Sequence, residues 1–112
     1  MEITAFKELF GDNPTIRVLD FFLTNSYFEY SMADVIREEG MSYNTLKPVW
    51  DELLKREILV KTGKLGKGVM YKVNNDSPVV KQLNKLIWTL VETDPETAHY
   101  FKPLKSKQRT NA

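Results

Sequence analysis

The sequence predicts a mostly α-helical domain that carries one small β-hairpin. Apolar residues recur at helical spacing in several segments of the 112-residue chain. Two short runs of β-branched and aromatic residues flank a glycine-rich segment, as two strands flank a turn. The hydrophobic share of 42% is enough for a packed core, and the chain length fits one domain. These observations favour helices and a hairpin packed around a single core.

The first two helices are predicted at residues 2–10 and 14–24, on either side of a polar break. Asn13 followed by Pro14 fits an N-cap and a first helical position. The second of these segments is apolar nearly all round, which is typical of a helix at the centre of a core.

Two further helices, at 31–39 and 42–57, are separated only by a short turn. Ser31 and Asp34 form a capping box at the start of the first, and Ser42 is the N-cap candidate of the second. The buried face of the second helix is expected to consist of apolar residues at helical spacing: Leu46, Val49, Trp50, Leu53 and Leu54. This arrangement predicts a helix-turn-helix unit.

A hairpin and a last helix complete the expected domain. Strands are predicted at 58–62 and 69–73, with a loop of three glycines and two lysines between them. The aromatic residues at 27–30 suggest another short extended piece. The last helix is expected at 78–91, so that residues 1–92 form the domain and 93–112 a polar, basic and mobile tail.

Charge is distributed unevenly along the chain, although the net charge is only +1. Residues 1–40 hold three basic and eight acidic side chains, a balance of −5. Residues 41–75 hold seven basic and three acidic side chains, a balance of +4. Such a basic segment is suited to nucleic acid phosphates, although a merely solvated surface would carry the same lysines.

Several segments of the sequence share the pattern of one protein family. They are residues 10–14, Ser31 to Ser42, the run Leu46-x-x-Val49-Trp50-x-x-Leu53-Leu54-x-x-x-Ile58-Leu59-Val60, the run Val69-x-Tyr71-x-Val73-Asn74, and residues 75–80. Over about residues 14–92 the chain resembles the winged helix-turn-helix transcriptional regulators, most closely small members from archaea and their viruses. The resemblance implies sequence-specific binding of double-stranded DNA, with helix 42–57 in the major groove and hairpin 58–73 as the wing.

Three positions depart from the family pattern. Family members usually have alanine where Ile36 stands and an apolar residue where Glu39 stands. Pro48 lies inside the expected recognition helix, where proline removes a backbone donor and crowds the carbonyl four residues earlier. Either the helix kinks at Pro48, or regular helix begins only near Lys47.

The candidate DNA-binding residues come from the recognition helix and the wing. At the start of the helix they are Ser42, Tyr43, Asn44, Thr45 and Lys47, which the buried apolar face leaves pointing outward. The amide of Asn44 matches adenine, Lys47 can reach guanine or a phosphate, and the hydroxyls can donate to phosphates. Ser42 has the alternative of serving only as an N-cap, and Trp50 is interpreted as a core residue rather than a stacking platform.

On the wing the candidates are Lys61, Lys64 and Lys67. Lysines at that position contribute affinity for phosphates rather than sequence information. The alternative is that they only keep an exposed sheet edge soluble.

No enzyme chemistry is expected. The absence of cysteine excludes disulfides, thiolate zinc sites and cysteine nucleophiles. The only histidine, His99, has no pair of carboxylates at ligand spacing, and the glycines at 63–68 do not precede a helix that could bind phosphate. We therefore expect no metal, no cofactor and no evident small-molecule ligand.

A cytoplasmic protein without a membrane partner is expected. No apolar run approaches the ~20 residues of a membrane helix. Residues 1–10 also lack the basic start of a signal peptide.

A homodimer is the expected assembly. Val80, Leu83, Ile87 and Leu90 recur at about the spacing of a helix-pairing seam, and the helix at 2–10 offers a second apolar strip. The alternative is that the last helix folds back and buries this seam within its own chain.

A second alternative concerns function: the domain is a winged-helix module for protein–protein interaction whose recognition helix no longer enters the DNA groove because of Pro48.

Overall fold

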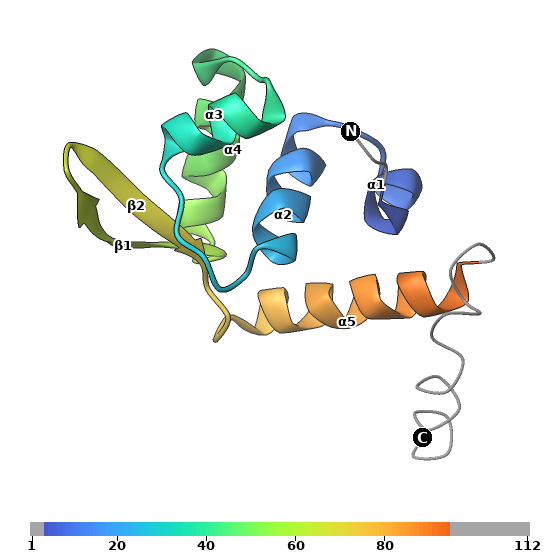
Figure 1. Cartoon of the computed structure of the whole chain (residues 1–112). Helices are drawn as coiled ribbons and strands as arrows, with labels where there is room; N and C mark the ends of the chain where they lie inside the picture. Colours follow the sequence, from blue (N-terminus) through green and yellow to red (C-terminus); the bar gives the residue numbers. More distant parts are fainter. Residues whose placement is uncertain (1–3, 95–112) are drawn as a thin grey trace.

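The structure is a computed structural model of the chain, and it describes residues 4–94 (Figure 1). Its elements are, in chain order, α1 (Ala5–Phe10), α2 (Pro14–Thr24), α3 (Met32–Glu39), α4 (Tyr43–Lys55), β1 (Leu59–Leu65), β2 (Gly68–Val73) and α5 (Pro78–Thr93). The two strands form one antiparallel sheet. The predicted fold class, mostly helical with a small hairpin, is confirmed.

Local capping signals set most of the helix boundaries. α2 spans the predicted residues, and Ser31 and Ser42 are N-caps whose hydroxyls accept backbone N–H bonds, so α3 and α4 each begin one residue later than predicted. α4 ends two residues earlier than predicted, and Glu57 beyond it has a left-handed φ of 58°.

The first helix ends at residue 10 and the last begins at residue 78, as predicted, but the start of the first and the end of the last differ. Thr4 is extended and its hydroxyl accepts the N–H of Lys7, so the first helix begins at Ala5 and not at residue 2. α5 continues to Thr93, past the predicted residue 91. Of the expected tail, residues 95–112 lie outside the described part of the chain.

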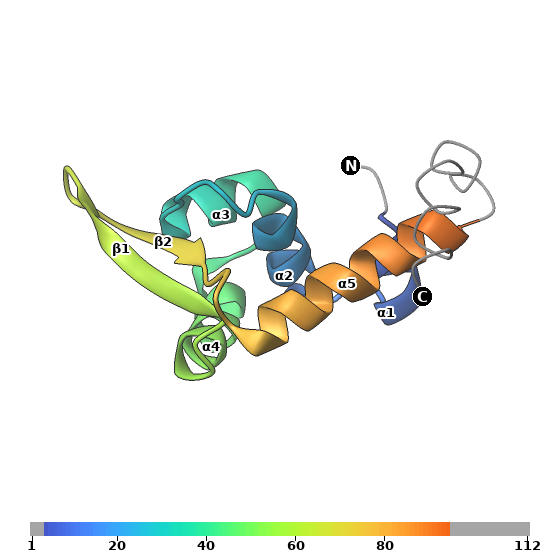
Figure 2. The same ribbon diagram turned by 90° about the horizontal axis from the view of Figure 1, so that it is seen from below.

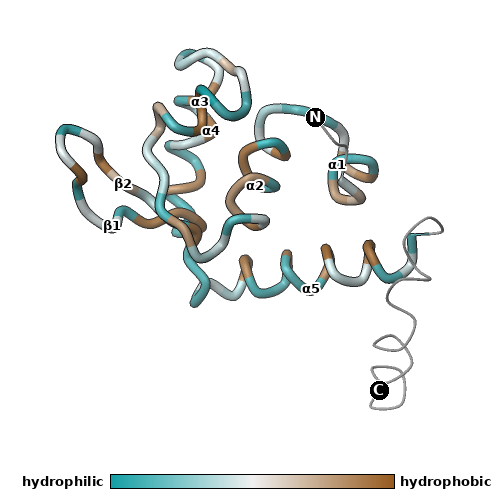
Figure 3. The backbone as a smooth tube through the Cα atoms, viewed as in Figure 1, coloured by the Kyte–Doolittle hydropathy of each residue, from teal (hydrophilic) through white to brown (hydrophobic). Residues whose placement is uncertain are grey.

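The core lies between α2, α3, α4 and the base of the hairpin. Trp50 is at its centre, with only 1% of its surface exposed. Its ring packs edge-on against Phe22 and Tyr71, with centroid distances of 5.5 and 5.1 Å. Figure 3 shows apolar positions along α2 and at the hairpin base, where this cluster forms. The interpretation of Trp50 as a core residue is therefore confirmed.

The hairpin is longer and its turn tighter than the sequence suggested. The expected loop at 63–68 is reduced to a two-residue turn, because β1 extends to Leu65 and β2 begins at Gly68. The strand register is irregular between Lys61 and Gly63, where one residue of β1 has no partner in β2. In the turn, Gly66 has a left-handed φ of 61°. The extended piece predicted at 27–30 is reduced to a single bridge between Tyr30 and Tyr71.

The hairpin and α5 extend from the helical body in different directions. The hairpin projects away from the helices in both Figure 1 and Figure 2. α5 starts near the hairpin base, runs past α2 and reaches α1, with which it packs. No helix within residues 4–94 has both the length and the apolar character needed to cross a bilayer.

Candidate nucleic-acid interface

The N-terminal end of α4 presents polar side chains to solvent. Tyr43, Asn44 and Thr45 are exposed, and Lys47 is half-exposed. On the opposite side of the helix Leu46, Trp50 and Leu53 are buried and Val49 is partly buried. The predicted division of α4 into a buried and an outward face is therefore present, while DNA binding by the outward residues stays a prediction.

The hydroxyl groups at the start of α4 have distinct roles. The Oγ of Ser42 accepts the N–H of Thr45 at 3.1 Å and donates to Oγ1 of Thr45 at 3.0 Å. Ser42 is therefore the N-cap of α4, and contact of either hydroxyl with DNA stays a prediction.

Pro48 is accommodated within a continuous helix. α4 runs from Tyr43 to Lys55, so the expectation that regular helix begins only near Lys47 is wrong. Pro48 is exposed, which gives its ring room outside the core. The carbonyl of Asn44, four residues earlier, has no N–H donor at position 48. The capped first turn and the buried apolar face stabilise the helix despite this missing hydrogen bond.

The acidic residues of α4 are paired within the helix. Lys47 Nζ lies 2.5 Å from Oδ1 of Asp51, and Arg56 pairs with Glu52 in the same i, i+4 relation. The hydrogen bond that Lys47 donates to Asp51 raises the pKa of Lys47. Lys47 therefore stays charged at all physiological pH values, and its ammonium group is already held beside a carboxylate.

The hairpin carries unopposed positive charge. Lys61, Lys64 and Lys67 are exposed, and none has an ion-pair partner within residues 4–94. Residues 58–75 include no aspartate or glutamate at all. One acidic side chain approaches from outside, since Thr62 donates a hydrogen bond to Glu29. This surface is therefore suited to binding an anion such as a phosphate backbone.

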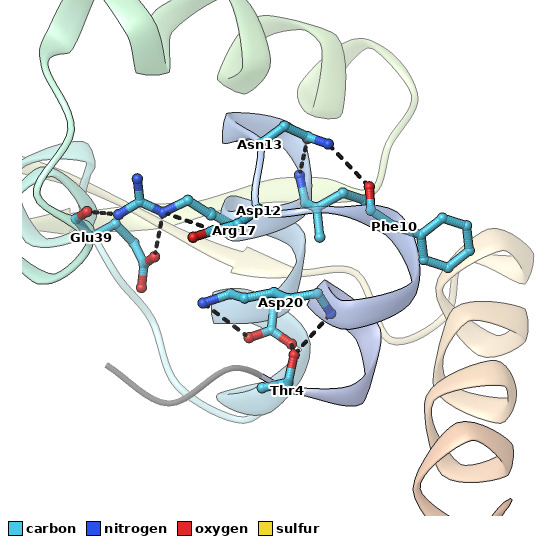
Figure 4. Close-up of polar contacts among 9 residues, drawn as sticks. Thr4, Phe10, Asp12, Asn13, Arg17, Asp20 and Glu39 are labelled. Carbon is cyan, nitrogen blue, oxygen red and sulfur yellow. Dashed lines mark hydrogen bonds and ion pairs between the residues drawn. The ribbon is translucent and has the colours of Figure 1, made fainter. Parts of the chain in front are cut away.

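Glu39, which departs from the family pattern, has a structural partner that the sequence did not reveal. It is buried, and Arg17 of α2 lies 3.4 Å from its carboxylate and also donates to its backbone carbonyl (Figure 4). Asp12 lies 3.6 Å from the same guanidinium group. Glu39 therefore attaches the end of α3 to α2 and needs no functional role to explain its presence.

A second buried polar cluster joins α1 to α2. Asp20 accepts a hydrogen bond from the Thr4 hydroxyl at 3.1 Å, and Lys7 Nζ lies 3.9 Å from its other oxygen (Figure 4). Burial raises the pKa of Asp20, and the bond from Thr4 and the charge of Lys7 oppose this only in part. No periodic pattern in the sequence indicated this cluster. Its residues were not candidates for any site.

The predicted dimer seam is mostly turned toward the chain's own core. Val80 is completely buried, and Leu83 and Ile87 pack against the core cluster. The prediction that Val80 contacts a second copy is therefore wrong, because its side chain is covered by its own domain. Leu90 is only partly buried, and Val79 beside Val80 is 50% exposed.

Other kinds of site were sought in the same part of the chain. Residues 4–94 contain no group of three or more histidine, aspartate or glutamate side chains placed to hold a metal ion.

The order of elements and the helix-turn-helix with its adjoining hairpin define a winged helix fold. A solved structure, the reduced form of MarR from E. coli, superposes on this chain with a TM-score of 0.59 at 12% sequence identity. The match covers 92% of this chain and 84% of the MarR chain. At that identity the similarity shows the fold alone. No protein-family model matches the sequence, and no curated protein matches it either.

Proposed function

We propose that this chain binds double-stranded DNA as a transcriptional regulator, with α4 in the major groove and the β1–β2 hairpin as the wing. The observation that carries the proposal is the hairpin surface, where three exposed lysines have no acidic partner in the described chain. In winged helix-turn-helix proteins the second helix of the motif is the element that enters the groove. Here that helix adjoins the lysine-bearing hairpin.

The outward end of α4 supplies the groups for reading bases. Asn44 carries a paired donor and acceptor that match the N6 and N7 edge of adenine. Tyr43, 52% exposed, precedes it and is placed to contact an adjacent base or sugar. Lys47 reaches guanine or a phosphate only by leaving Asp51, so its binding carries the cost of one surface ion pair. Thr45 and the free N–H groups of the first turn donate to phosphates.

The salt dependence of binding tests this proposal. We expect affinity for duplex DNA to fall steeply with salt. Lys61→Ala, Lys64→Ala and Lys67→Ala should lower the log–log slope by up to ~0.9 for each phosphate that is no longer neutralised. These changes should weaken specific and random duplexes alike. Asn44→Ala should instead reduce the preference for duplexes selected by the wild-type protein, by about 1–3 kcal/mol for each adenine that Asn44 reads.

Fluorescence anisotropy at several salt concentrations measures both quantities. Lys85→Ala, on α5, is the matched control for loss of one exposed lysine away from the hairpin. Binding that is absent, or that does not depend on salt, would contradict DNA binding and favour the protein-interaction module.

We also propose that a second copy of the chain covers the outer side of α5. Val79, Leu83, Leu86 and Leu90 recur at spacings of four, three and four residues in a stripe along α5. Val79 is exposed and Leu86 and Leu90 are partly buried, while Leu83 lies at the border and also packs against the core. An apolar groove of about 380 Å³ lies along this stripe, lined by Pro78, Val79, Gln82, Leu83 and Leu86. A two-fold dimer built on it would present two copies of α4 to DNA, which suits a near-palindromic site.

Sedimentation equilibrium tests the dimer. We expect the wild-type chain to have twice the monomer mass at tens of micromolar, and Val79→Glu and Leu86→Glu to return it to the monomer mass. Lys81→Glu, an exposed charge reversal on the same helix but off the stripe, should leave the dimer intact. A wild-type monomer would contradict this part of the proposal without affecting DNA binding.

A further inference from the structure

Leu65 occupies an unusual position at the tip of the hairpin. It is the last residue of β1, directly before the Gly66–Lys67 turn, and 74% of its surface is exposed. Its cross-strand partner is Gly68, which has no side chain to cover it. A leucine in this place receives little packing from its own hairpin, although most large apolar residues of a domain gain stability from burial.

The surroundings of Leu65 are positively charged and sterically open. Lys64 and Lys67 flank it in sequence, and both are exposed and without an ion-pair partner among residues 4–94. Gly63, Gly66 and Gly68 leave the tip without other bulky side chains, and a Cβ built at Gly63 or Gly66 would meet open space. The turn at the end of the hairpin projects away from the helical body (Figure 2), whereas Gly68 lies near the start of α3, where a Cβ built on it would be 3.9 Å from the Cβ of Ser31. One apolar side chain therefore projects between two cations.

We propose that Leu65 is an apolar wedge that enters the DNA minor groove and partly unstacks one base step, while Lys64 and Lys67 bind the phosphates on either side. The inference rests on the proposed DNA-binding function and assigns a role to a residue outside the base-reading helix. The minor groove is about 6 Å wide, so it can take up a single side chain from a hairpin tip but not a helix. Leucine is one of the residue types that minor-groove proteins insert between base pairs.

A wedge at this position gives the protein a second means of selecting its site. Inserted side chains kink DNA toward the major groove. Pyrimidine–purine steps such as TA and CA are unstacked more easily than A-tracts. The protein therefore prefers a flexible step beneath the hairpin tip, even though Leu65 makes no hydrogen bond to a base.

The bend of the DNA, and not the affinity, is the quantity that reports the wedge. Burial of the leucine side chain favours binding, whereas unstacking of the base step opposes it, and the two effects are of similar size. We therefore expect Leu65→Ala to change the affinity by less than about tenfold. The bend of the bound duplex should largely disappear.

The experiment uses the full chain and a duplex of about three helical turns, selected by the wild-type protein from a random-sequence library. Donor and acceptor dyes on the two ends report bending as increased energy transfer. We expect increased transfer with the wild-type protein and with Leu65→Met, which keeps a similar volume, and little increase with Leu65→Ala. Lys64→Ala with Lys67→Ala should lower affinity and salt dependence but keep the increased transfer at saturation. Replacing a TA or CA step under the tip by an A-tract should weaken binding of the wild-type protein and not of Leu65→Ala.

Each outcome decides between the alternatives. Equal energy transfer with the wild-type protein and Leu65→Ala, or wild-type binding without bending, would overturn the wedge and leave DNA binding intact. Failure of the wild-type protein to bind any duplex would remove the proposed function, and the wedge with it. Binding to vesicles with phosphatidylserine that Leu65→Ala abolishes, together with unchanged DNA bending, would assign Leu65 to a lipid surface and overturn the inference.

Discussion

At the scale of single residues, the buried carboxylate of Glu39 depends on one partner. Arg17 reaches it from α2, and the arginine side chain is 22% exposed whereas the glutamate side chain is 9% exposed. Removing one member of a buried pair costs about 3–5 kcal/mol, because the other charge is left without compensation. Since Arg17 keeps some contact with water, we expect Arg17→Leu to lower the free energy of unfolding by only about 2 kcal/mol.

Urea denaturation at neutral pH measures this change. Arg37→Leu is the matched control, because Arg37 pairs with Asp34 on the surface and should cost at most about 1 kcal/mol. The double variant Arg17→Leu with Glu39→Leu should recover part of the stability, since it removes the unpaired charge as well. Equal effects of Arg17→Leu and Arg37→Leu would show that the Arg17–Glu39 pair contributes no more than a surface pair.

Asp20 gives a prediction of the pH dependence of stability. Burial raises its pKa above the ordinary value of 3.8, so the folded chain holds this proton more tightly than the unfolded chain. The contribution of Asp20 is therefore fully present below pH 3.8 and is lost as the pH rises through the raised pKa. We expect the stability of Asp20→Asn, relative to wild type, to increase over this range, as measured by denaturation at a series of pH values. A constant difference between the two proteins would contradict the prediction.

At the scale of elements, the capping box of α3 should show the opposite pH dependence. The backbone N–H of Ser31 donates to Asp34, and this bond is the main reason that the pKa of Asp34 is lowered. The resulting stability is present above pH 3.8 and is lost as the pH falls through the lowered pKa. Asp34→Asn should therefore reduce the loss of stability in acid. Ser31→Ala, which removes the other half of the box, should cost about 1 kcal/mol at neutral pH.

Thermal unfolding followed by circular dichroism at pH 7 and at lower pH measures both variants. Glu38→Gln, an exposed carboxylate on the same helix without a hydrogen bond or ion pair among residues 4–94, controls for a general change of charge. If Asp34→Asn loses as much stability in acid as the wild-type protein does, Asp34 is not the source of this pH dependence.

At the scale of the whole molecule, the structure predicts which part of the chain is needed for stability. All residues of the core cluster lie between Val18 and Val80. A chain that ends at Asp94 should therefore keep its free energy of unfolding to within about 0.5 kcal/mol. The removed segment contains four basic residues, Lys102, Lys105, Lys107 and Arg109. If they bind phosphates, the truncated chain should bind DNA more weakly and with a lower salt slope, by up to ~0.9 for each phosphate bound.

Denaturation and anisotropy measurements on the same two proteins separate these effects. A large loss of stability on truncation would show that the removed segment packs on the domain. An unchanged salt slope would exclude the segment from the DNA interface.

Features that depend on neighbouring residues could be predicted from the amino-acid sequence. Ser31 and Ser42 fixed the starts of α3 and α4, because an N-cap acts on N–H groups only two or three residues away. The apolar spacing in α4 predicted which of its sides is buried, because the helical period is constant. The mostly helical fold with one hairpin, and the outward position of Tyr43 and Asn44, followed from these local rules.

Features that depend on residues far apart in the sequence became visible only in the folded chain. Arg17 and Glu39 are 22 positions apart, so nothing in the sequence could pair them. The spacing of the apolar residues of α5 allows more than one side of the helix to face the core. Packing selected Val80 and Ile87 for the inside, which left Val79 exposed and Leu86 only partly covered. The glycine-rich segment permitted either a loose loop or a tight turn. Strand pairing up to Leu65 and Gly68 selected the tight turn, because it satisfies more backbone hydrogen-bonding groups, and so placed Leu65 at the tip.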